Sequence, residues 1–170
     1  IVVNSLVLVA VVTALCLLVG VPLAVLTVQT DLPFRRLWTV LAALPLVIPS
    51  YIGAFAFDSI SGSEGLLAEI TGIDVFPQVQ GLWGTVLVLT LFTYPYVYLT
   101  TRASLQSFDG TVVEAARTLN HGRLSAFRRV TLPQIAPAVA AGALLAALYA
   151  LSDFGTPMIM QYDVFTREIF

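Results

Sequence analysis

The chain carries the stretch Glu114-Ala115-Ala116-Arg117-Thr118-Leu119-Asn120-His121-Gly122, a polar segment in a very apolar sequence. It continues through three further arginines, at positions 123, 128 and 129, to Leu132-Pro133. Apolar runs lie on both sides of it, since residues 75–101 and 130–152 contain no Asp, Glu, Lys or Arg. A polar island between two such runs is typical of a loop at the water-facing surface of a membrane protein.

The overall composition excludes ordinary soluble domains. Of the 170 residues, 58% are hydrophobic and only 11% are charged, which leaves too little polar surface to cover a domain of this size in water. Charge-free runs at 1–30, 37–57, 75–101 and 130–152 are each long enough to cross a hydrocarbon core, which takes about 20 apolar residues as helix. We therefore expect an all-α fold, a polytopic bundle with transmembrane helices at about 3–28, 37–57, 82–101 and 133–153.

The arginines predict which side of the membrane each loop faces. The chain has no lysine, and seven of its eight arginines follow the first and third runs, at positions 35, 36, 102, 117, 123, 128 and 129. Because basic residues concentrate in cytoplasmic loops, residues 102–132 are expected in the cytoplasm. The loop over residues 58–81 has four acidic residues and no basic one, so it is expected outside. We expect residues 1–170 to be one transmembrane domain, a fragment of a longer protein with a further span after Phe170.

Prolines and small residues predict how the spans are shaped and packed. A proline inside a helix removes a backbone hydrogen bond and bends the helix, and bent helices can line a cavity. Prolines at positions 22, 45, 49 and 95 are among those inside the charge-free runs. In the fourth run, close approach of another helix backbone is expected at small residues, namely Ala138, Ala141 and Gly142.

The cytoplasmic loop contains the signals of a short helix. The sequence Thr111-Val112-Val113-Glu114 fits a capping box, in which the Thr hydroxyl and the Glu carboxylate satisfy backbone amides at a helix start. Asn120 suits the left-handed conformation that ends a helix. Such a helix can insert its alanines into a groove of a partner protein. Two alternatives stay open: Glu114 acts only as the cap, or the helix lies on lipid, to which two alanines offer little apolar area.

This loop resembles the signature loop of importer-type ATP-binding-cassette (ABC) permeases. There, a Glu-Ala-Ala triplet, a turn glycine and a terminal Leu-Pro form the coupling helix that contacts the ATPase. The order of the four spans, with the loop between the third and fourth, is similar to type I ABC importer permeases over nearly the whole chain. The family usually has glycine where this chain has asparagine. The resemblance implies that the ATPase-docking residues are Glu114, Ala115, Ala116, Arg117, Leu119, Asn120 and Gly122.

Two other segments, residues 91–98 and 151–156, are similar to the first half of ferric-iron permeases, which carry two such repeats in one polypeptide. This resemblance implies import of ferric iron, and thiamine, polyamine and phosphonate-type permeases remain alternatives because they share much of the pattern. Carboxylate and phenol oxygens are hard ligands that suit a trivalent cation. The candidate substrate-pathway residues are therefore Tyr94, Tyr96, Tyr98, Ser152 and Asp153, with Asp153 as the candidate metal-facing group. Alternatively, Asp153 forms a turn or caps the following segment.

The source of energy is expected outside the spans. Proton- or sodium-coupled transporters usually place ionisable residues deep in the membrane, whereas the four runs contain no Asp, Glu, Lys or Arg. The sequence has no phosphate-binding loop, so ATP and Mg²⁺ are expected on a separate ATPase, and this chain is expected to bind no cofactor. A membrane enzyme is disfavoured because the sequence offers no paired carboxylates, metal cluster or nucleophile with a base.

The resemblance to type I ABC importer permeases implies the partners and the location. The expected partners are a cytoplasmic ABC ATPase dimer, an external or periplasmic substrate-binding protein, a second permease half that is fused or separate, and membrane lipid, with no nucleic acid. The expected location is the cytoplasmic (inner) membrane of a bacterium or archaeon, which the chain crosses several times.

Overall fold

The structure, a computed structural model, describes residues 1–61, 79–107, 129 and 131–169. These residues form helices and connecting segments without any strand, which confirms the all-α prediction. Three of the described helices are long and apolar enough to cross a membrane: α1 (Val2–Gln29), α5 (Gly81–Ser107) and α8 (Leu132–Ser152). The helix predicted to start near Thr111 lies outside the described residues, as does most of the cytoplasmic loop.

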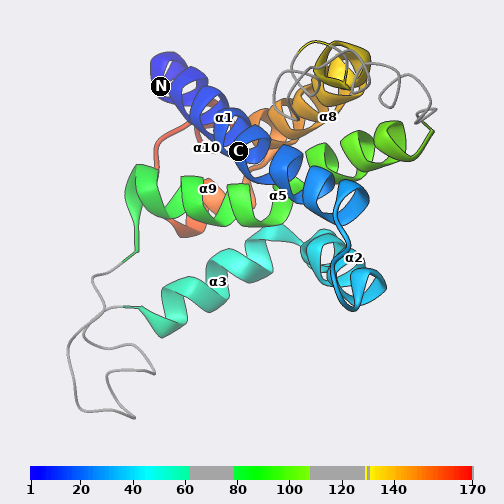
Figure 1. The fold of residues 1–170 in the computed structure, drawn as a ribbon. Coiled ribbons are helices and arrows are strands. Elements are labelled where there is room, and N and C mark those ends of the chain that lie inside the picture. Colours follow the sequence, from blue (N-terminus) through cyan, green and yellow to red (C-terminus); the bar gives the residue numbers. More distant parts are fainter. Residues whose placement is uncertain (62–78, 108–128, 130, 170) are drawn as a thin grey trace.

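Helix α5 is the centre of the bundle. It packs against both α1 and α8, which also contact each other (Figure 1). In the most apolar stretch of α5, 61% of the residues are buried, compared with 22% in α1 and in α8. The two outer helices therefore keep wide apolar faces free for lipid or for other protein.

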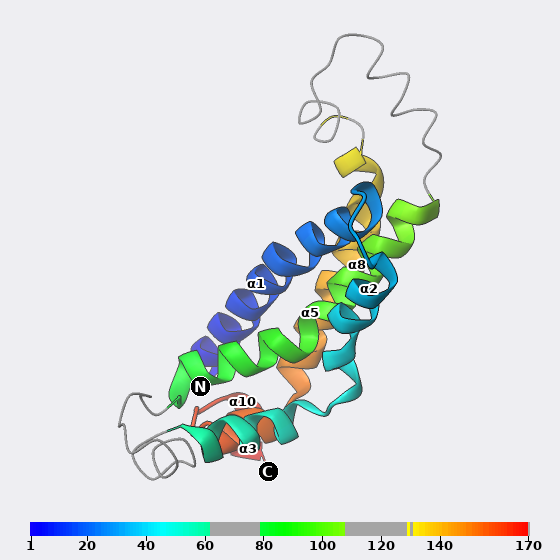
Figure 2. The same cartoon turned by 60° about the horizontal axis from the view of Figure 1, so that its bottom comes forward.

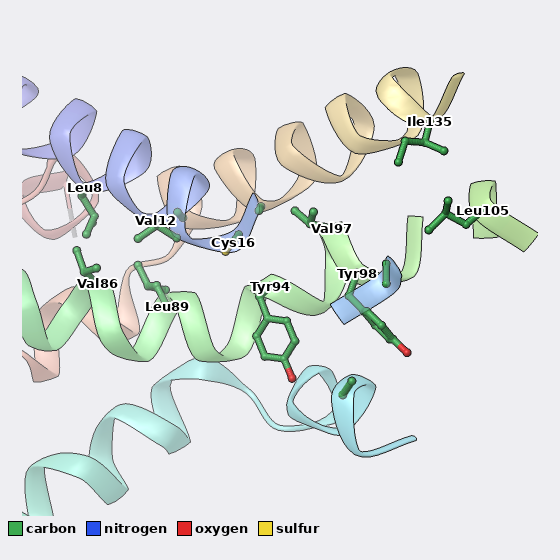
Figure 3. Packing of buried hydrophobic residues seen from close by; sticks show 14 of the residues in the cluster. Leu8, Val12, Cys16, Val86, Leu89, Tyr94, Val97, Tyr98, Leu105 and Ile135 are labelled. Carbon is green, nitrogen blue, oxygen red and sulfur yellow. The ribbon is translucent and has the colours of Figure 1, made fainter. Parts of the chain in front are cut away.

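The main core follows the contact between α1 and α5. Val12 and Cys16 of α1 lie against Leu89 and Val97 of α5, and all four are fully buried (Figure 3). Lipid tails are as apolar as these side chains, so burial here gains little from excluding water. Close packing and van der Waals contact are what hold this core together in a bilayer.

Two glycines allow the outer helices to approach α5 closely. A Cβ atom on Gly142 of α8 would lie 2.3 Å from the Thr100 Oγ1 atom, and one on Gly20 of α1 would lie 2.9 Å from the Val97 Cβ atom. No side chain fits at either position without a shift of its neighbours. The close approach predicted for Gly142 is thus confirmed, whereas Ala141 is exposed.

The second apolar run is a broken helix. It comprises α2 (Arg35–Ala43), a 3₁₀ turn η1 (Leu44–Val47) and α3 (Ser50–Ile60), with a bend of 90° between the two parts. Pro45 lies in the 3₁₀ turn, and Pro49 immediately precedes α3. Proline lacks the amide hydrogen that a continuous helix needs, so two prolines four residues apart end one helix and start another. The span predicted for residues 37–57 is therefore two helices that meet at a sharp bend, while α1 and α5 continue through Pro22 and Pro95.

The end of the described chain folds back onto the start of α1. After α8 come two short helices, α9 (Gly155–Ile159) and α10 (Phe165–Ile169), and the segment between them reaches the first turn of α1. The Phe165 amide donates to the Ser5 hydroxyl at 2.9 Å, and the Asn4 amide donates to the Asp163 carbonyl at 3.1 Å. Partial burial raises the pKa of the nearby Tyr162 phenol above its usual range.

Candidate functional site

Asp153 lies directly after α8 and is held by three hydrogen bonds. Its Oδ2 atom accepts from the Ser50 hydroxyl and from the Thr156 hydroxyl, each at 2.7 Å. Its Oδ1 atom accepts from the Thr156 backbone amide at 3.3 Å. The carboxylate is half buried, and these donors replace the water that it gives up. It thereby joins the first residue of α3 to the junction of α8 and α9.

The local sequence explains this geometry. Thr156 lies in the first turn of α9, where backbone amides have no partner within the helix, and the Asp153 carboxylate satisfies one of them. A Cβ atom on Gly155 would lie 2.7 Å from the Tyr51 Cβ atom, so glycine is what allows α3 to come this close. These hydrogen bonds to Thr156 agree with the alternative in which Asp153 has a structural role, as a turn or cap at the start of the following segment. A role in the ion pathway stays a prediction.

A chain of polar and aromatic contacts continues from Asp153 toward α5. The Ser50 hydroxyl also lies 3.0 Å from the Tyr149 hydroxyl of α8. The Tyr149 ring in turn lies against Tyr96, with ring centroids 5.9 Å apart and the planes tilted by 41°. Side chains from α3, α5 and α8 therefore meet in one cluster, which we call the Asp153 cluster: Ser50, Tyr96, Tyr149, Asp153 and Thr156.

The five residues predicted for the substrate pathway do not form one group. Tyr94 and Tyr98 are four residues apart and share one face of α5, whereas Tyr96 points to another face, because side chains repeat every 3.6 residues. The Tyr98 hydroxyl donates to the Thr27 hydroxyl of α1 at 3.2 Å. The Tyr94 ring points toward α2 (Figure 3). Ser152 is exposed, and its hydroxyl donates to a carbonyl of its own helix. Only Tyr96 and Asp153 of the five belong to the cluster.

Sequence reasoning missed three members of the cluster. Tyr149 precedes Asp153 by one helical turn, so the i to i+4 spacing was a signal for this pair. Thr156, three residues after Asp153, is the usual partner of a capping carboxylate. Ser50 lies 103 residues from Asp153, and no local pattern could have connected the two.

The cluster offers little to a metal ion. Among the described residues, no group of three His, Cys, Asp or Glu side chains lies close enough to bind one. The described part of the chain contains an ion pair between Arg167 and Asp163, with 2.6 Å between the charged groups. This pair is exposed and separate from the Asp153 cluster. Asp153 therefore depends on hydroxyl and amide donors for its stabilisation. The predicted ATPase-docking residues, 114–122, lie outside the described residues.

Comparison with known proteins finds one family and several transport permeases that are similar to this chain. The family described as the binding-protein-dependent transport system inner membrane component matches residues 16–161. A protein of Haloferax volcanii named as a probable molybdenum ABC transporter permease is 30% identical over 159 residues, which cover 94% of this chain and 58% of that protein. An Fe(3+)-transport system permease of Haemophilus influenzae is 30% identical over 136 residues, 80% of this chain and 24% of that protein.

A third relative is the sulfate transport system permease of Salmonella typhimurium, 30% identical over 147 residues, which cover 85% of this chain and 52% of that protein. The chain thus spans a quarter to somewhat more than half of the length of these relatives. The matched region includes the second half of α1, all of the broken second run, α5 and α8, with the loop between the last two. The chain belongs to the family of binding-protein-dependent transport system inner membrane components and is a multi-pass membrane protein.

Proposed function

We propose that the chain forms part of the translocation pathway of an ATP-driven importer, in which a separate ATPase supplies the energy and an external binding protein delivers the substrate. The observation that carries the proposal is the family match over residues 16–161, which includes the Glu-Ala-Ala loop as well as the spans on either side. The relative named as a probable molybdenum ABC transporter permease supports it. In this proposal the chain hydrolyses no ATP itself.

The arrangement of helix ends supports the proposed orientation. The end of α1, the start of α2, the end of α5 and the start of α8 all lie at the same end of the bundle (Figure 2). The described arginines of the two basic segments, at positions 35, 36, 102 and 129, belong to these helix ends and their flanks. We place this end in the cytoplasm, since basic residues favour that side. Asp58 and Asp163 then belong to the external end.

The packing suggests how a push on the cytoplasmic loop reaches the other side. The loop joins α5 to α8, and Gly142 brings those two helices into backbone contact. A displacement of the loop would therefore move α5 and α8 together. At the outer end of α8, the Asp153 cluster links this movement to α3 and α9. Alternating access with a second permease half, fused or separate, is the mechanism that we propose.

For the substrate we propose a small inorganic oxyanion. The relatives named for molybdenum and for sulfate match 94% and 85% of this chain, and molybdenum in neutral water is a tetrahedral dianion like sulfate. In addition, the Asp153 carboxylate already accepts three hydrogen bonds, which leaves it poorly placed to coordinate a passing cation.

Ferric iron is the second candidate, favoured by the Haemophilus influenzae relative, which matches 80% of this chain. Transport of ferric iron through this site would require Asp153 to exchange its hydroxyl partners for the ion. Thiamine, polyamines and phosphonates have no support among the three relatives described above.

The experiment is an uptake assay with the full-length protein, its ATPase and its binding protein, in a host that lacks its own molybdate, sulfate and ferric-iron importers. Radiolabelled molybdate, sulfate and ferric citrate are supplied separately. The proposal predicts ATP-dependent uptake of an oxyanion and background uptake of iron. Iron uptake alone would replace the oxyanion assignment by the second candidate. Absence of ATP-dependent uptake of any solute, in a correctly assembled complex, would contradict the proposed function itself.

A further inference from the structure

Two adjoining hollows lie where α1 ends and α2 begins. The first is an apolar groove of about 400 Å³ between α1, α2 and α5. The second is an open hollow of about 780 Å³ around the connecting segment, residues 31–37. Leu32 lines both, so the two form one continuous surface that is polar at one end and apolar at the other.

The polar end carries an excess of positive charge. Arg35 and Arg36 line the open hollow together with Asp31, which gives the three side chains a net charge of +1. Both arginines are exposed, and in the described parts of the chain neither guanidinium has a hydrogen-bond or ion-pair partner. An unpaired arginine pair at a membrane surface is suited to a phosphate group, which a guanidinium binds through two parallel hydrogen bonds.

The apolar end is shaped for a hydrocarbon chain. Its walls include leucines of α1 and α2 and the half-exposed Trp38, a residue type that is enriched at the edge of the bilayer. A water molecule occupies about 30 Å³ and a methylene is similar in size, so the groove holds on the order of ten methylenes. The Tyr94 side chain also lines the groove, and its hydroxyl has no partner among the described residues. The lining residues are Leu23, Leu26, Thr27, Leu32, Trp38, Leu41, Ala42 and Tyr94.

We propose that this surface is a binding site for one anionic glycerophospholipid of the adjacent leaflet. Arg35 and Arg36 hold the phosphate, one acyl chain occupies the groove, and the Tyr94 hydroxyl donates to an ester carbonyl. The net charge of +1 favours an anionic headgroup over a zwitterionic one. Bound in this way, the lipid fills the space between α1 and the broken second run, where the described chain has no side chain to do so. The proposal needs only the membrane location of the chain and is independent of the transported substrate.

The test uses the full-length protein in liposomes of phosphatidylethanolamine that contain a small fraction of photoactivatable phosphatidylglycerol, with the reactive group on the acyl chain. After illumination, labelled peptides are identified by mass spectrometry. The variants are Arg35→Gln with Arg36→Gln, which removes the charge, and Ala42→Phe, which fills the groove. Arg167→Gln, which removes an arginine from the opposite end of the bundle, is the matched control. Thermal unfolding of each purified variant checks that it is folded.

We expect labelling of peptides that contain residues 23–42. Each arginine near an anionic surface contributes about a factor of five to lipid affinity, so the double variant should label about 25-fold less, with no change for Arg167→Gln. Ala42→Phe should also lose labelling although its charge is unchanged. If the double variant fails to fold, Arg36→Gln alone and Ala42→Phe give the same comparison, with an expected fivefold loss for the former.

Several results would overturn the proposal. Equal labelling of the wild type and of the folded charge variant would show that Arg35 and Arg36 do not bind the lipid phosphate. Equal labelling by a photoactivatable phosphatidylcholine would exclude selection for an anionic headgroup. Full displacement of the lipid by millimolar inorganic phosphate would show that the groove contributes nothing. Labelling confined to other peptides would show that the groove is covered by protein, for example the second permease half.

Discussion

Asp153 gives the sharpest test of how the helices of this chain are joined. Replacement by alanine removes the acceptor of two short hydroxyl bonds and of one amide bond, from Ser50 and Thr156. Replacement by asparagine preserves the shape. Its Oδ1 atom can still accept from the Thr156 amide, and its amide hydrogens can donate to the two hydroxyl oxygens once the hydroxyls rotate. The two variants therefore separate loss of the hydrogen bonds from loss of the negative charge.

The magnitude follows from the number and type of bonds. A hydrogen bond to a charged group contributes about 1.5–3 kcal/mol, but Asp153 is half exposed, so water recovers a large part of the loss. Ser50 also keeps the Tyr149 hydroxyl as a partner. We expect Asp153→Ala to cost about 3 kcal/mol in the free energy of unfolding. Neutral hydrogen bonds are about half as strong as charged ones, so Asp153→Asn should cost about 1.5 kcal/mol.

The assay is denaturant unfolding of the full-length protein in mixed micelles, followed by circular dichroism. Ser50→Ala is combined with Asp153→Ala in a double-mutant cycle, and a coupling energy of about 1–2 kcal/mol is expected for this pair. Equal destabilisation by Asn and Ala, or a coupling energy near zero, would refute the reasoning. In uptake assays, the cap interpretation predicts that Asn keeps transport while Ala reduces it. Equal loss of transport in both, with normal assembly and ATPase activity, would support an ion pathway through Asp153.

The remaining predictions concern packing and orientation. Gly142→Ala places a Cβ atom 2.3 Å from the Thr100 Oγ1 atom and should cost about 1–3 kcal/mol in thermal or denaturant unfolding, whereas Ala141→Val at an exposed site should cost little; equal effects would contradict the proposed close contact. Single cysteines placed at positions 36, 63 and 123 in a Cys16→Ser background test the orientation. An impermeant thiol reagent applied to intact cells should label only position 63, and labelling of position 123 without position 63 would reverse the topology.

The helical form of the apolar segments could be predicted because charge-free runs in a membrane have few alternatives. The break in the second run was harder to predict from the sequence. Pro22 and Pro95 are tolerated within continuous helices, whereas Pro45 and Pro49 separate α2 from α3. A single proline removes only one backbone hydrogen bond of a helix. The sequence around one proline therefore does not decide between a mild bend and a full break. Two prolines close together were the signal that favoured the break.

The polar contacts were predictable only where they are local. The turn or cap alternative for Asp153 rests on local sequence, and the structure joins Asp153 to Thr156, three residues later, by two hydrogen bonds. The contact of Ser50 with Asp153 depends on the 90° bend before α3 and on the lack of a side chain at Gly155. The three tyrosines lie close together in sequence but on different faces of α5: Tyr96 contacts Tyr149 of α8, Tyr98 contacts α1, and Tyr94 lines the groove beside α2.

The most direct test of the central claim is substrate-stimulated ATP hydrolysis by the complete transporter in proteoliposomes. The wild-type complex is compared with Ala116→Asp, which places an unpaired charge on the proposed docking helix, and with Glu114→Ala, which removes a helix cap worth about 1 kcal/mol. We predict that loaded binding protein stimulates hydrolysis in the wild type, that Ala116→Asp abolishes this stimulation, and that Glu114→Ala weakens it. Normal stimulation in a fully assembled Ala116→Asp complex would contradict the claim that this loop couples ATP hydrolysis to transport.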